Sequence, residues 1–211
     1  MHGIFPYIQD KKHLIWDWNG TLLDDARLCV EVLGELLVEH HLPAVTLEQY
    51  RSHFRLPVRK YYEHLGFRFD IFSFDEIAGE WIKRYMQRVS DQRLFPKTID
   101  FLKLCMGSAR AQHILSAAKE TDLHHLLRHF GISHFFQYVF GLDDNSASSK
   151  LERGRALLQQ LGCQPEEAIL IGDTDHDIFV GRELGIQVLA LGDGHQSPER
   201  LVGLGVPILV R

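Results

Sequence analysis

Short, mostly hydrophobic runs recur along the chain and predict buried β-strands. The first begins at His13, ends at Trp16 and stops abruptly at Asp17. Nearly continuous runs of this length are typical of parallel strands that are covered on both faces. Similar runs follow at residues 113–115, 138–140, 168–171 and 188–191, with a weaker one at residues 208–210.

Segments with a helical spacing of hydrophobic residues lie between several of these runs. One covers residues 150–161 and is followed by Gly162, and another covers residues 177–184 and is followed by Gly185. Glycine just past the last turn is a common stop signal for a helix. Strands that alternate with helices predict an α/β fold built on a doubly wound parallel sheet.

This alternation breaks down between about residue 25 and residue 94. Helical patterns follow one another there without a strand between them, at residues 26–41, 58–65 and 75–89. Asp24 or Asp25 could cap the first of these helices. We therefore predict two domains: a core of residues 1–24 and 94–211, and an inserted small α-helical domain of residues 25–93.

Polar residues stand where the predicted strands end. In chain order they are Asp17, Asn19 and Thr21 after the first strand, Ser116 after the second, Lys150 at a helix start after the third, and Asp173 and Asp177 after the fourth. In open α/β sheets, ligands bind at the carboxyl ends of the strands. We therefore expect these side chains to meet at one edge of the sheet.

Carboxylates, a hydroxyl and an amine at one sheet edge indicate metal-assisted phosphoryl transfer. A phosphate monoester dianion repels a carboxylate nucleophile, and a hard divalent cation held by carboxylates removes much of that repulsion. Asp17 and Asp173 can share such a cation and leave one oxygen of Asp17 free to attack. Lys150 and Ser116 can bind the transferring phosphoryl group, and Asp177 can orient Lys150 or a metal-bound water.

These residues make the chain resemble the haloacid dehalogenase-like hydrolase superfamily, near the phosphoglycolate phosphatases with a small helical cap. The family motifs fall in order on Asp17, Asn19 and Thr21, on Ser116, on Lys150, and on Gly172, Asp173 and Asp177. The resemblance implies a Rossmann-like core, a C1-type helical cap domain and Mg2+ as the cofactor. It also implies an aspartyl-phosphate intermediate on Asp17.

The implied activity is hydrolysis of a small phosphorylated metabolite, such as phosphoglycolate or a sugar phosphate. The resemblance places the metal at Asp17, Asp173 and Asp177, with the backbone carbonyl of Asn19 as a further ligand. In the cap, Arg55 belongs to a loop that faces the active site in the resembling family. We expect Arg55 to bind the remote anion of the substrate, and a solvated basic loop is the alternative.

Asn19 departs from the family pattern. Phosphatases of the family usually carry an aspartate here, which protonates the leaving group and later activates water. Asparagine cannot transfer a proton, and general acid–base catalysis is worth roughly 10²–10⁴-fold in rate. One alternative is therefore a catalytically weak phosphate-binding or regulatory protein. Another is C–P bond cleavage, because phosphonoacetaldehyde hydrolases share the pattern Asp-Trp-x-Gly-Thr and use a cap lysine, for which Lys60 is the candidate.

Composition narrows the expected partners. Hydrophobic residues make up 45% of the chain and charged residues 24%, with a net charge of −5. Lys and Arg form no dense block, so we expect no nucleic-acid partner. The sparse cysteines favour a reducing compartment, and no hydrophobic run reaches the roughly 18 residues that a membrane span needs. We expect a cytoplasmic protein, either a monomer or a homodimer.

Overall fold

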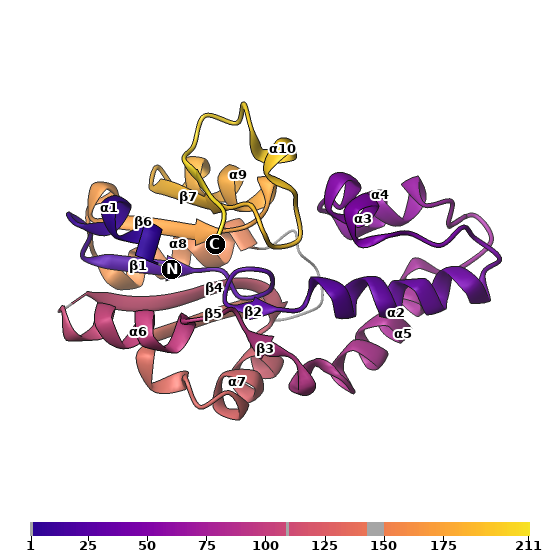
Figure 1. Cartoon of the computed structure of the whole chain (residues 1–211), viewed down its shortest axis with the longest axis horizontal. Coiled ribbons are helices and arrows are strands. Elements are labelled where there is room, and N and C mark those ends of the chain that lie inside the picture. Colours follow the sequence, from indigo (N-terminus) through magenta and orange to yellow (C-terminus); the bar gives the residue numbers. More distant parts are fainter. Residues whose placement is uncertain (1, 109, 143–149) are drawn as a thin grey trace.

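A six-stranded parallel sheet forms the centre of the larger part of the molecule (Figure 1). The computed structural model describes residues 2–108, 110–142 and 150–211. Within them the strand order is β5-β4-β1-β6-β7-β8. The strands are β1 (His13–Trp16), β4 (Ala111–Lys119), β5 (Tyr138–Leu142), β6 (Ala168–Gly172), β7 (Gln187–Leu191) and β8 (Ile208–Leu209). Each predicted hydrophobic run forms one of these strands, so the predicted α/β fold is confirmed.

Helices cover both faces of the sheet, which is why the strands are hydrophobic on both sides. Leu14 and Trp16 of β1 belong to one cluster of buried side chains, whereas Ile15 belongs to the other. Side chains alternate between the two faces along a strand. The first cluster includes residues of α6 (Thr98–Gly107) and α7 (Glu120–His129), and the second includes residues of α8 (Lys150–Leu161) and α9 (Asp175–Glu183).

A helical region is inserted between β1 and α6 and lies to one side of the sheet (Figure 1). Two chain segments connect this region to the rest of the chain, β2 (Leu23–Asp24) and β3 (Arg93–Leu94), and they pair as antiparallel strands. Its helices are α2 (Ala26–Glu39), α3 (Leu47–His53), α4 (Val58–His64) and α5 (Phe74–Met86). The inserted helical region is confirmed, while the exact domain bounds stay a prediction. We call this region the cap below.

Helix α3 was not expected from the hydrophobic pattern. A capping box begins it, because the Thr46 hydroxyl accepts a hydrogen bond from the Gln49 amide and the Gln49 side chain accepts one from the Thr46 amide. This pair of residues is a local signal for a helix start that does not depend on hydrophobic spacing. Helix α3 matters for function because it carries Tyr50 and Arg51, which contact the core.

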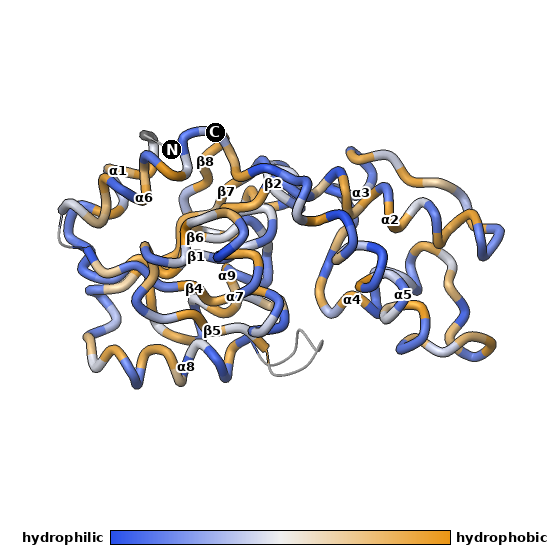
Figure 2. The backbone as a smooth tube through the Cα atoms, turned by 90° about the horizontal axis from the view of Figure 1, so that it is seen from below, coloured by the Kyte–Doolittle hydropathy of each residue, from blue (hydrophilic) through white to orange (hydrophobic). Residues whose placement is uncertain are grey.

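Short elements complete the described part of the chain. They are α1 (Phe5–Ile8), α10 (Pro198–Leu201) and 3-10 turns at His2–Ile4, Val89–Asp91, Ser133–Phe135 and Pro165–Glu167. Figure 2 shows hydrophobic central strands enclosed by helices of mixed hydropathy. Across the described ranges, every helix is too short or too polar to pass through a membrane.

Candidate active site

The predicted site residues meet at the carboxyl edge of the sheet. Strands β1 and β6 are neighbours, with Trp16 paired to Ile171, so the residues that follow them emerge side by side. Ligand atoms of Asp17, Asp173 and Asp177 all lie within 4.8 Å of one another, and all three side chains are buried. Crowding three carboxylates in this way is costly unless positive charge is close by.

Lys150 supplies part of that positive charge. Its Nζ atom lies 2.6 Å from Asp17 Oδ1 and 2.5 Å from Asp177 Oδ1. Burial alone would lower the pKa of Lys150, but the two carboxylates outweigh it and hold the pKa above its ordinary value. Burial raises the pKa of Asp17, and Asp177 and Asp173 raise it further against the opposing effect of Lys150. The nucleophile candidate is therefore short of positive charge.

Asp177 is held in place by the start of α9. Its Oδ2 atom accepts hydrogen bonds from the Thr174 hydroxyl at 2.6 Å and from the backbone amides of Thr174 and Asp173 at 3.0 and 3.2 Å. These bonds form because Thr174 and Asp177 make a capping box. Oδ1 is left for Lys150, so this local structure fixes the ammonium group beside Asp17.

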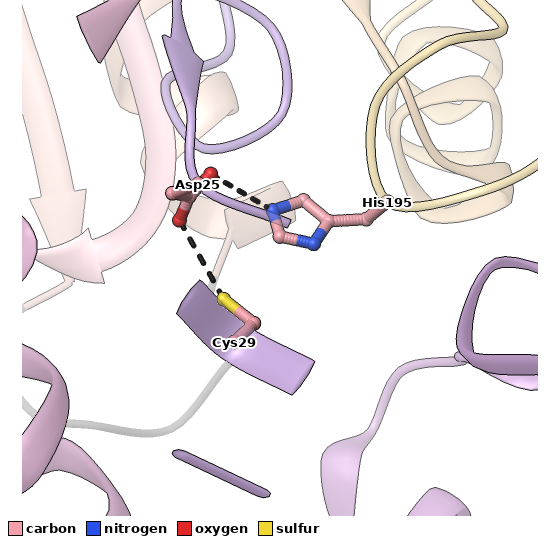
Figure 3. A group of neighbouring side chains, drawn as sticks. All are labelled: Asp25, Cys29 and His195. Carbon is pink, nitrogen blue, oxygen red and sulfur yellow. Dashed lines mark hydrogen bonds and ion pairs between the residues drawn. The ribbon is translucent and has the colours of Figure 1, made fainter. Parts of the chain in front are cut away.

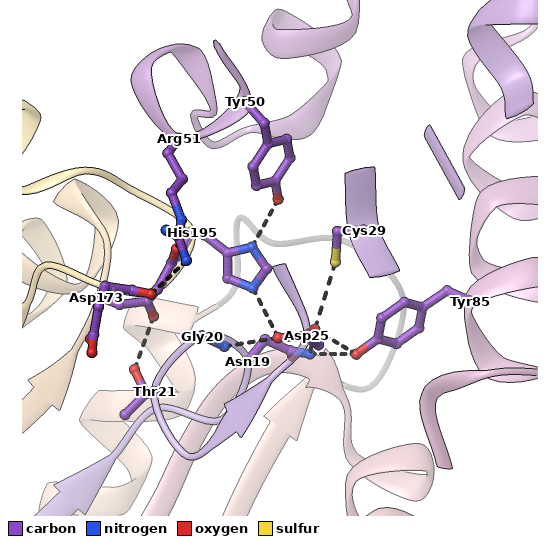
Figure 4. Close-up of polar contacts among 12 residues, drawn as sticks. Asn19, Gly20, Thr21, Asp25, Cys29, Tyr50, Arg51, Tyr85, Asp173 and His195 are labelled. Carbon is purple, nitrogen blue, oxygen red and sulfur yellow. Dashed lines mark hydrogen bonds and ion pairs between the residues drawn. The ribbon is translucent and has the colours of Figure 1, made fainter. Parts of the chain in front are cut away.

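Asp173 is held by the first motif and by the loop after β7. Its Oδ1 atom accepts a hydrogen bond from the Thr21 hydroxyl at 2.9 Å, and its Oδ2 atom accepts one from the backbone amide of His195 at 2.6 Å (Figure 4). A Cβ atom at Gly20 or Gly194 would lie 2.3 Å from Asp173 Oδ2. Both glycines are therefore required for the backbone to approach this carboxylate.

Asn19 and Asp25 form a second polar cluster beside the carboxylates (Figure 4). Asp25 stands at the N-cap position of α2, but its side chain makes no capping bond. Its carboxylate instead accepts hydrogen bonds from Asn19 Nδ2 at 2.8 Å, the Tyr85 hydroxyl at 2.7 Å and the Gly20 amide at 3.0 Å. The expected capping by Asp25 is therefore wrong, because a buried carboxylate takes these donors in preference to the helix end.

His195 completes this second cluster (Figure 3). Its Nε2 atom lies 3.2 Å from Asp25 Oδ1, and its Nδ1 atom lies 2.9 Å from the Tyr50 hydroxyl. Burial would lower the pKa of His195, but Asp25 and Asp173 raise it to about 9. Burial alone would raise the pKa of Asp25, but His195, Tyr85 and Asn19 hold that pKa below its ordinary value. The two side chains form a buried ion pair.

The same cluster contains a thiol, and its chemistry does not favour a second metal. The ligand atoms of Asp25, Cys29 and His195 lie within 4.8 Å of one another. Cys29 Sγ donates to Asp25 Oδ2 at 3.6 Å, and burial and Asp25 raise the pKa of the thiol. Cys29 and His195 would both have to lose a proton to bind a transition metal.

Sequence reasoning missed His195, Tyr50 and Tyr85 as members of this site. His195 had a usable signal, because it follows β7 in the run Gly192-Asp193-Gly194-His195 and so stands at the same edge of the sheet. Tyr50 and Tyr85 had none, because both belong to cap helices whose orientation depends on tertiary packing.

A cavity of about 720 Å³ lies above the carboxylates, between the core and the cap. Asp17, Ser116 and Lys150 contribute to its floor. Lys60 is exposed and Arg55 is half-buried, with Nε donating to the His53 carbonyl at 3.3 Å. Among the described residues, those lining the cavity include neither Arg55 nor Lys60. The structure therefore brings together the core residues predicted for the site but not these two cap residues.

Residues 14–191 match the model of the family described as haloacid dehalogenase-like hydrolase. The chain belongs to this family, and the predicted resemblance is confirmed. The core motifs and the inserted cap described above are the features that the chain shares with this family.

Several curated proteins are similar to the chain. It is 25% identical over 137 residues to a 5'-nucleotidase of Pseudomonas aeruginosa, and this match covers 62% of each protein. It is 28% identical to the pyrophosphatase PpaX of Bacillus velezensis, over 82% of this chain and 79% of that protein. It is 25% identical to a phosphoglycolate phosphatase of Caulobacter vibrioides, over 93% of this chain and 85% of that protein.

Solved structures show the same fold. A haloacid dehalogenase-like hydrolase from Streptococcus pneumoniae superposes with a TM-score of 0.82 at 22% identity, over 96% of this chain and 95% of that one. Protein tyrosine kinase A of Mycobacterium tuberculosis superposes with a TM-score of 0.79 at 23% identity, over 95% and 94% of the two chains. Proteins with such different names share the architecture, so activity must be argued from the site.

Proposed function

We propose that this protein is a phosphatase that hydrolyses the phosphate monoester of a small metabolite through a covalent intermediate on Asp17. The observation that carries the proposal is the position of Asp17 at the end of β1, on the floor of the cavity and in contact with Lys150. Lys150 engages Oδ1, which leaves Oδ2 for attack. Relatives named phosphoglycolate phosphatase and 5'-nucleotidase support a phosphorylated metabolite as substrate.

The donor atoms at the site fit Mg2+, which prefers oxygen ligands. We infer that Asp17, Asp173 and the backbone carbonyl of Asn19 would hold the ion. Asp177 belongs to the same carboxylate cluster, and its bonds to Thr174 and Lys150 favour its second predicted role, orienting Lys150. When bound, the ion supplies positive charge that offsets the repulsion between the phosphate dianion and the Asp17 carboxylate.

The residues of the floor support a two-step displacement. Asp17 attacks phosphorus, so that a new P–O bond to Asp17 forms while the P–O bond to the leaving alcohol breaks. Lys150 and Ser116 bind the oxygens of the transferring group, as charge-assisted donors do in phosphoryl transfer. Water then attacks phosphorus, the P–O bond to Asp17 breaks, and inorganic phosphate is released while the proton of the water passes to solvent. Asn19 offers no proton for either step.

Replacement of the nucleophile tests the proposal. We expect Asp17→Asn to lower phosphate release from p-nitrophenyl phosphate in Mg2+ by at least roughly 10²-fold, because no other carboxylate replaces the covalent step. Circular dichroism should show an unchanged fold, since Lys150 keeps Asp177 as a partner.

Lys60→Met is the matched control, because Lys60 is an exposed cap residue outside the cavity lining. It should keep full activity. Residual activity of Asp17→Asn above a tenth of the wild-type value would contradict the nucleophile assignment. A wild-type protein that binds phosphate without turnover would favour the regulatory alternative. Borohydride trapping of an aldehyde phosphonate on wild-type protein but not on Lys60→Met would favour C–P cleavage.

A further inference from the structure

We propose that the substrates of this enzyme are aryl phosphates, the phosphate monoesters of phenols, and that the cap side of the cavity binds their aromatic ring. This inference rests on the proposed phosphatase function and names its substrate class. Three features of the described residues support it: the size and apolar character of the cavity wall, the engagement of the Asn19, Tyr50 and Tyr85 polar groups within the protein, and the asparagine at position 19.

The cavity is much larger than phosphoglycolate requires. Its volume of about 720 Å³ lies within the range of roughly 300–1,000 Å³ found for pockets that hold drug-sized ligands. The phosphoryl group needs only the floor around Asp17 and Lys150. The remaining space lies against the cap, so a small hydroxy acid would leave most of it filled with water.

The wall on the cap side is apolar and rich in aromatic rings. Its lining includes Leu33, Tyr62, Phe74, Trp81, Ile82 and Met86. The Trp81 and Tyr85 rings are stacked, with centroids 4.9 Å apart and an interplanar angle of 13°. A flat apolar ring that binds against such a wall is removed from water together with the wall, which favours binding, and contacts between aromatic rings add further attraction.

Among the described residues, the cavity wall carries positive and negative side chains in equal number, and one of them already contacts other residues of the cap. Arg59 and Asp75 are the charged lining residues contributed by α4 and α5. The Arg59 side chain donates to Glu63 at 3.2 Å, and its guanidinium lies 5.7 Å from the centroid of the Phe74 ring. Lys119 and Asp122 add one charge of each sign on the core side. The described residues of the wall therefore present no excess of positive charge to bind a second anion such as the carboxylate of phosphoglycolate.

Several polar groups beside the floor of the cavity are already engaged within the protein. The Asn19 amide donates to Asp25 and to the Tyr85 hydroxyl, and the Tyr85 hydroxyl donates to Asp25. The Tyr50 hydroxyl pairs with His195. Hydroxyl groups buried against the apolar part of this wall would lose their bonds to water without replacement. That part of the wall therefore favours an apolar ring over a polyol.

Asn19 also favours aryl phosphates, because it limits which leaving groups can depart. Without an acid at this position, the leaving oxygen must depart as an anion. The phenol of tyrosine has a pKa of about 10, so a phenolate departs far more readily than the alkoxide of an ordinary alcohol. In the first step the P–O(aryl) bond breaks as the P–O bond to Asp17 forms, and the phenolate takes its proton from solvent. The wall and the reacting centre thus favour the same ester.

The closing experiment compares substrates of wild-type enzyme in Mg2+. We expect kcat/KM for 2-naphthyl phosphate to exceed that for phenyl phosphate by about tenfold, because the leaving groups are similar and only the buried ring is larger. Cyclohexyl phosphate should bind but turn over at least about 10²-fold more slowly than phenyl phosphate. Phosphoglycolate and glucose 6-phosphate should be poorer than either aryl ester.

Cap variants locate the effect. Trp81→Ala should raise KM for 2-naphthyl phosphate about tenfold and change KM for phenyl phosphate much less, whereas Trp81→Phe should restore most of the affinity. Phe72→Ala is the matched control, because Phe72 is an exposed aromatic residue of the cap outside the cavity lining. It should leave both constants unchanged.

Three outcomes would overturn the inference. The first is a higher kcat/KM for phosphoglycolate or glucose 6-phosphate than for 2-naphthyl phosphate. The others are equal kcat/KM values for 2-naphthyl and phenyl phosphate, and an equal rise in KM for these two esters in Trp81→Ala. Failure of the proposed function is distinguished by calorimetry with 2-naphthylmethylphosphonate, which cannot be hydrolysed. If the wild-type protein binds this phosphonate and Trp81→Ala binds it more weakly, the aromatic-ring site is supported even in a protein without turnover. If the wild-type protein does not bind it, the ring site is rejected.

Discussion

At the scale of single residues, the contacts of Asp25 explain why position 19 is an asparagine. Asn19 Nδ2 donates to Asp25 Oδ2 at 2.8 Å. An aspartate at position 19 would place a second carboxylate against the first, in a site that already holds Asp17 and Asp173. Asn19 thus stands where the family's usual acid would be and is tied to the ion pair of Asp25 with His195, and the proposed activity suits leaving groups that need no proton.

His113 illustrates a different consequence of burial, on folding stability. It is fully buried in β4, its ring is stacked on Tyr138, and burial with the neighbouring His13 lowers its pKa from 6.5 to about 4. Below pH 6.5 the unfolded chain binds a proton at His113 that the folded chain does not. Stability therefore falls as the pH decreases from about 6.5 towards 4.

We predict that wild-type protein loses about 2 kcal/mol of unfolding free energy at this residue between pH 7.5 and pH 5. Urea unfolding at the two pH values measures it. His113→Gln should show a correspondingly smaller difference, while His125→Gln, at an exposed histidine of α7, should keep the wild-type difference. A His113→Gln protein with the full wild-type pH response would refute the assignment.

At the scale of elements, α3 of the cap contacts the core loop that supplies His195. Arg51 Nε donates to the Gly194 carbonyl and Arg51 Nη2 to the Asp193 carbonyl, both at 2.8 Å. The Ser197 amide donates to the Arg51 carbonyl at 3.2 Å. The loop also donates its His195 amide to Asp173, so α3 and the carboxylate cluster are linked through a few residues.

Arg51→Ala should loosen this contact. Hydrogen bonds from a charged donor are worth roughly 1.5–3 kcal/mol each, and this change removes two of them. We predict faster amide exchange at residues 193–197 and a KM raised several-fold, with a smaller change in kcat, because the floor residues keep their own contacts. Hydrogen exchange and steady-state kinetics measure the two effects.

Arg55→Ala is the comparison for this variant, because Arg55 is a neighbouring cap arginine that bonds to the His53 carbonyl within the cap. Amide exchange at residues 193–197 should stay at the wild-type rate in Arg55→Ala. Equal acceleration in both variants would mean that cap stability in general, and not the Arg51 contact, protects the loop.

At the scale of the whole molecule, three buried carboxylates within 4.8 Å make the folded state sensitive to a cation. Burial raises the pKa of Asp173 as well as that of Asp17, which indicates that their negative charge is under-compensated. A ligand that binds only the folded state stabilises it by about 2.7 kcal/mol at 100 times its Kd.

We predict that saturating Mg2+ raises Tm by roughly 5–10 °C over protein in excess chelator. Asp173→Asn should lose most of this rise in Tm. In excess chelator its own Tm should be no lower than that of wild type, because the substitution removes one of the crowded charges. Asp100→Asn, at an exposed acid of α6, should respond as wild type does. A Tm that is independent of Mg2+ would count against the proposed ion site.

Local patterns along the chain determined the sheet and one side of the active site. The hydrophobic runs marked the strands because most side chains of a strand that is covered on both faces are buried and apolar. The residues after those runs, such as Asp17 and Asp173, could be assigned to one edge because parallel strands all end there. The helix at residues 150–161 was predicted with the bounds that α8 has.

Only the tertiary structure decided what surrounds these residues. Asp24 or Asp25 was expected to cap α2. Asp25 stands at the N-cap position, yet contacts with Tyr85 and His195, which are distant in sequence, turned its carboxylate towards Asn19. The pattern did not show which face of each cap helix lines the cavity, because that depends on how the helices pack against one another. For the same reason Arg55 and Lys60, whose types suggested contact with substrate, lie outside the lining, and aromatic side chains form the wall.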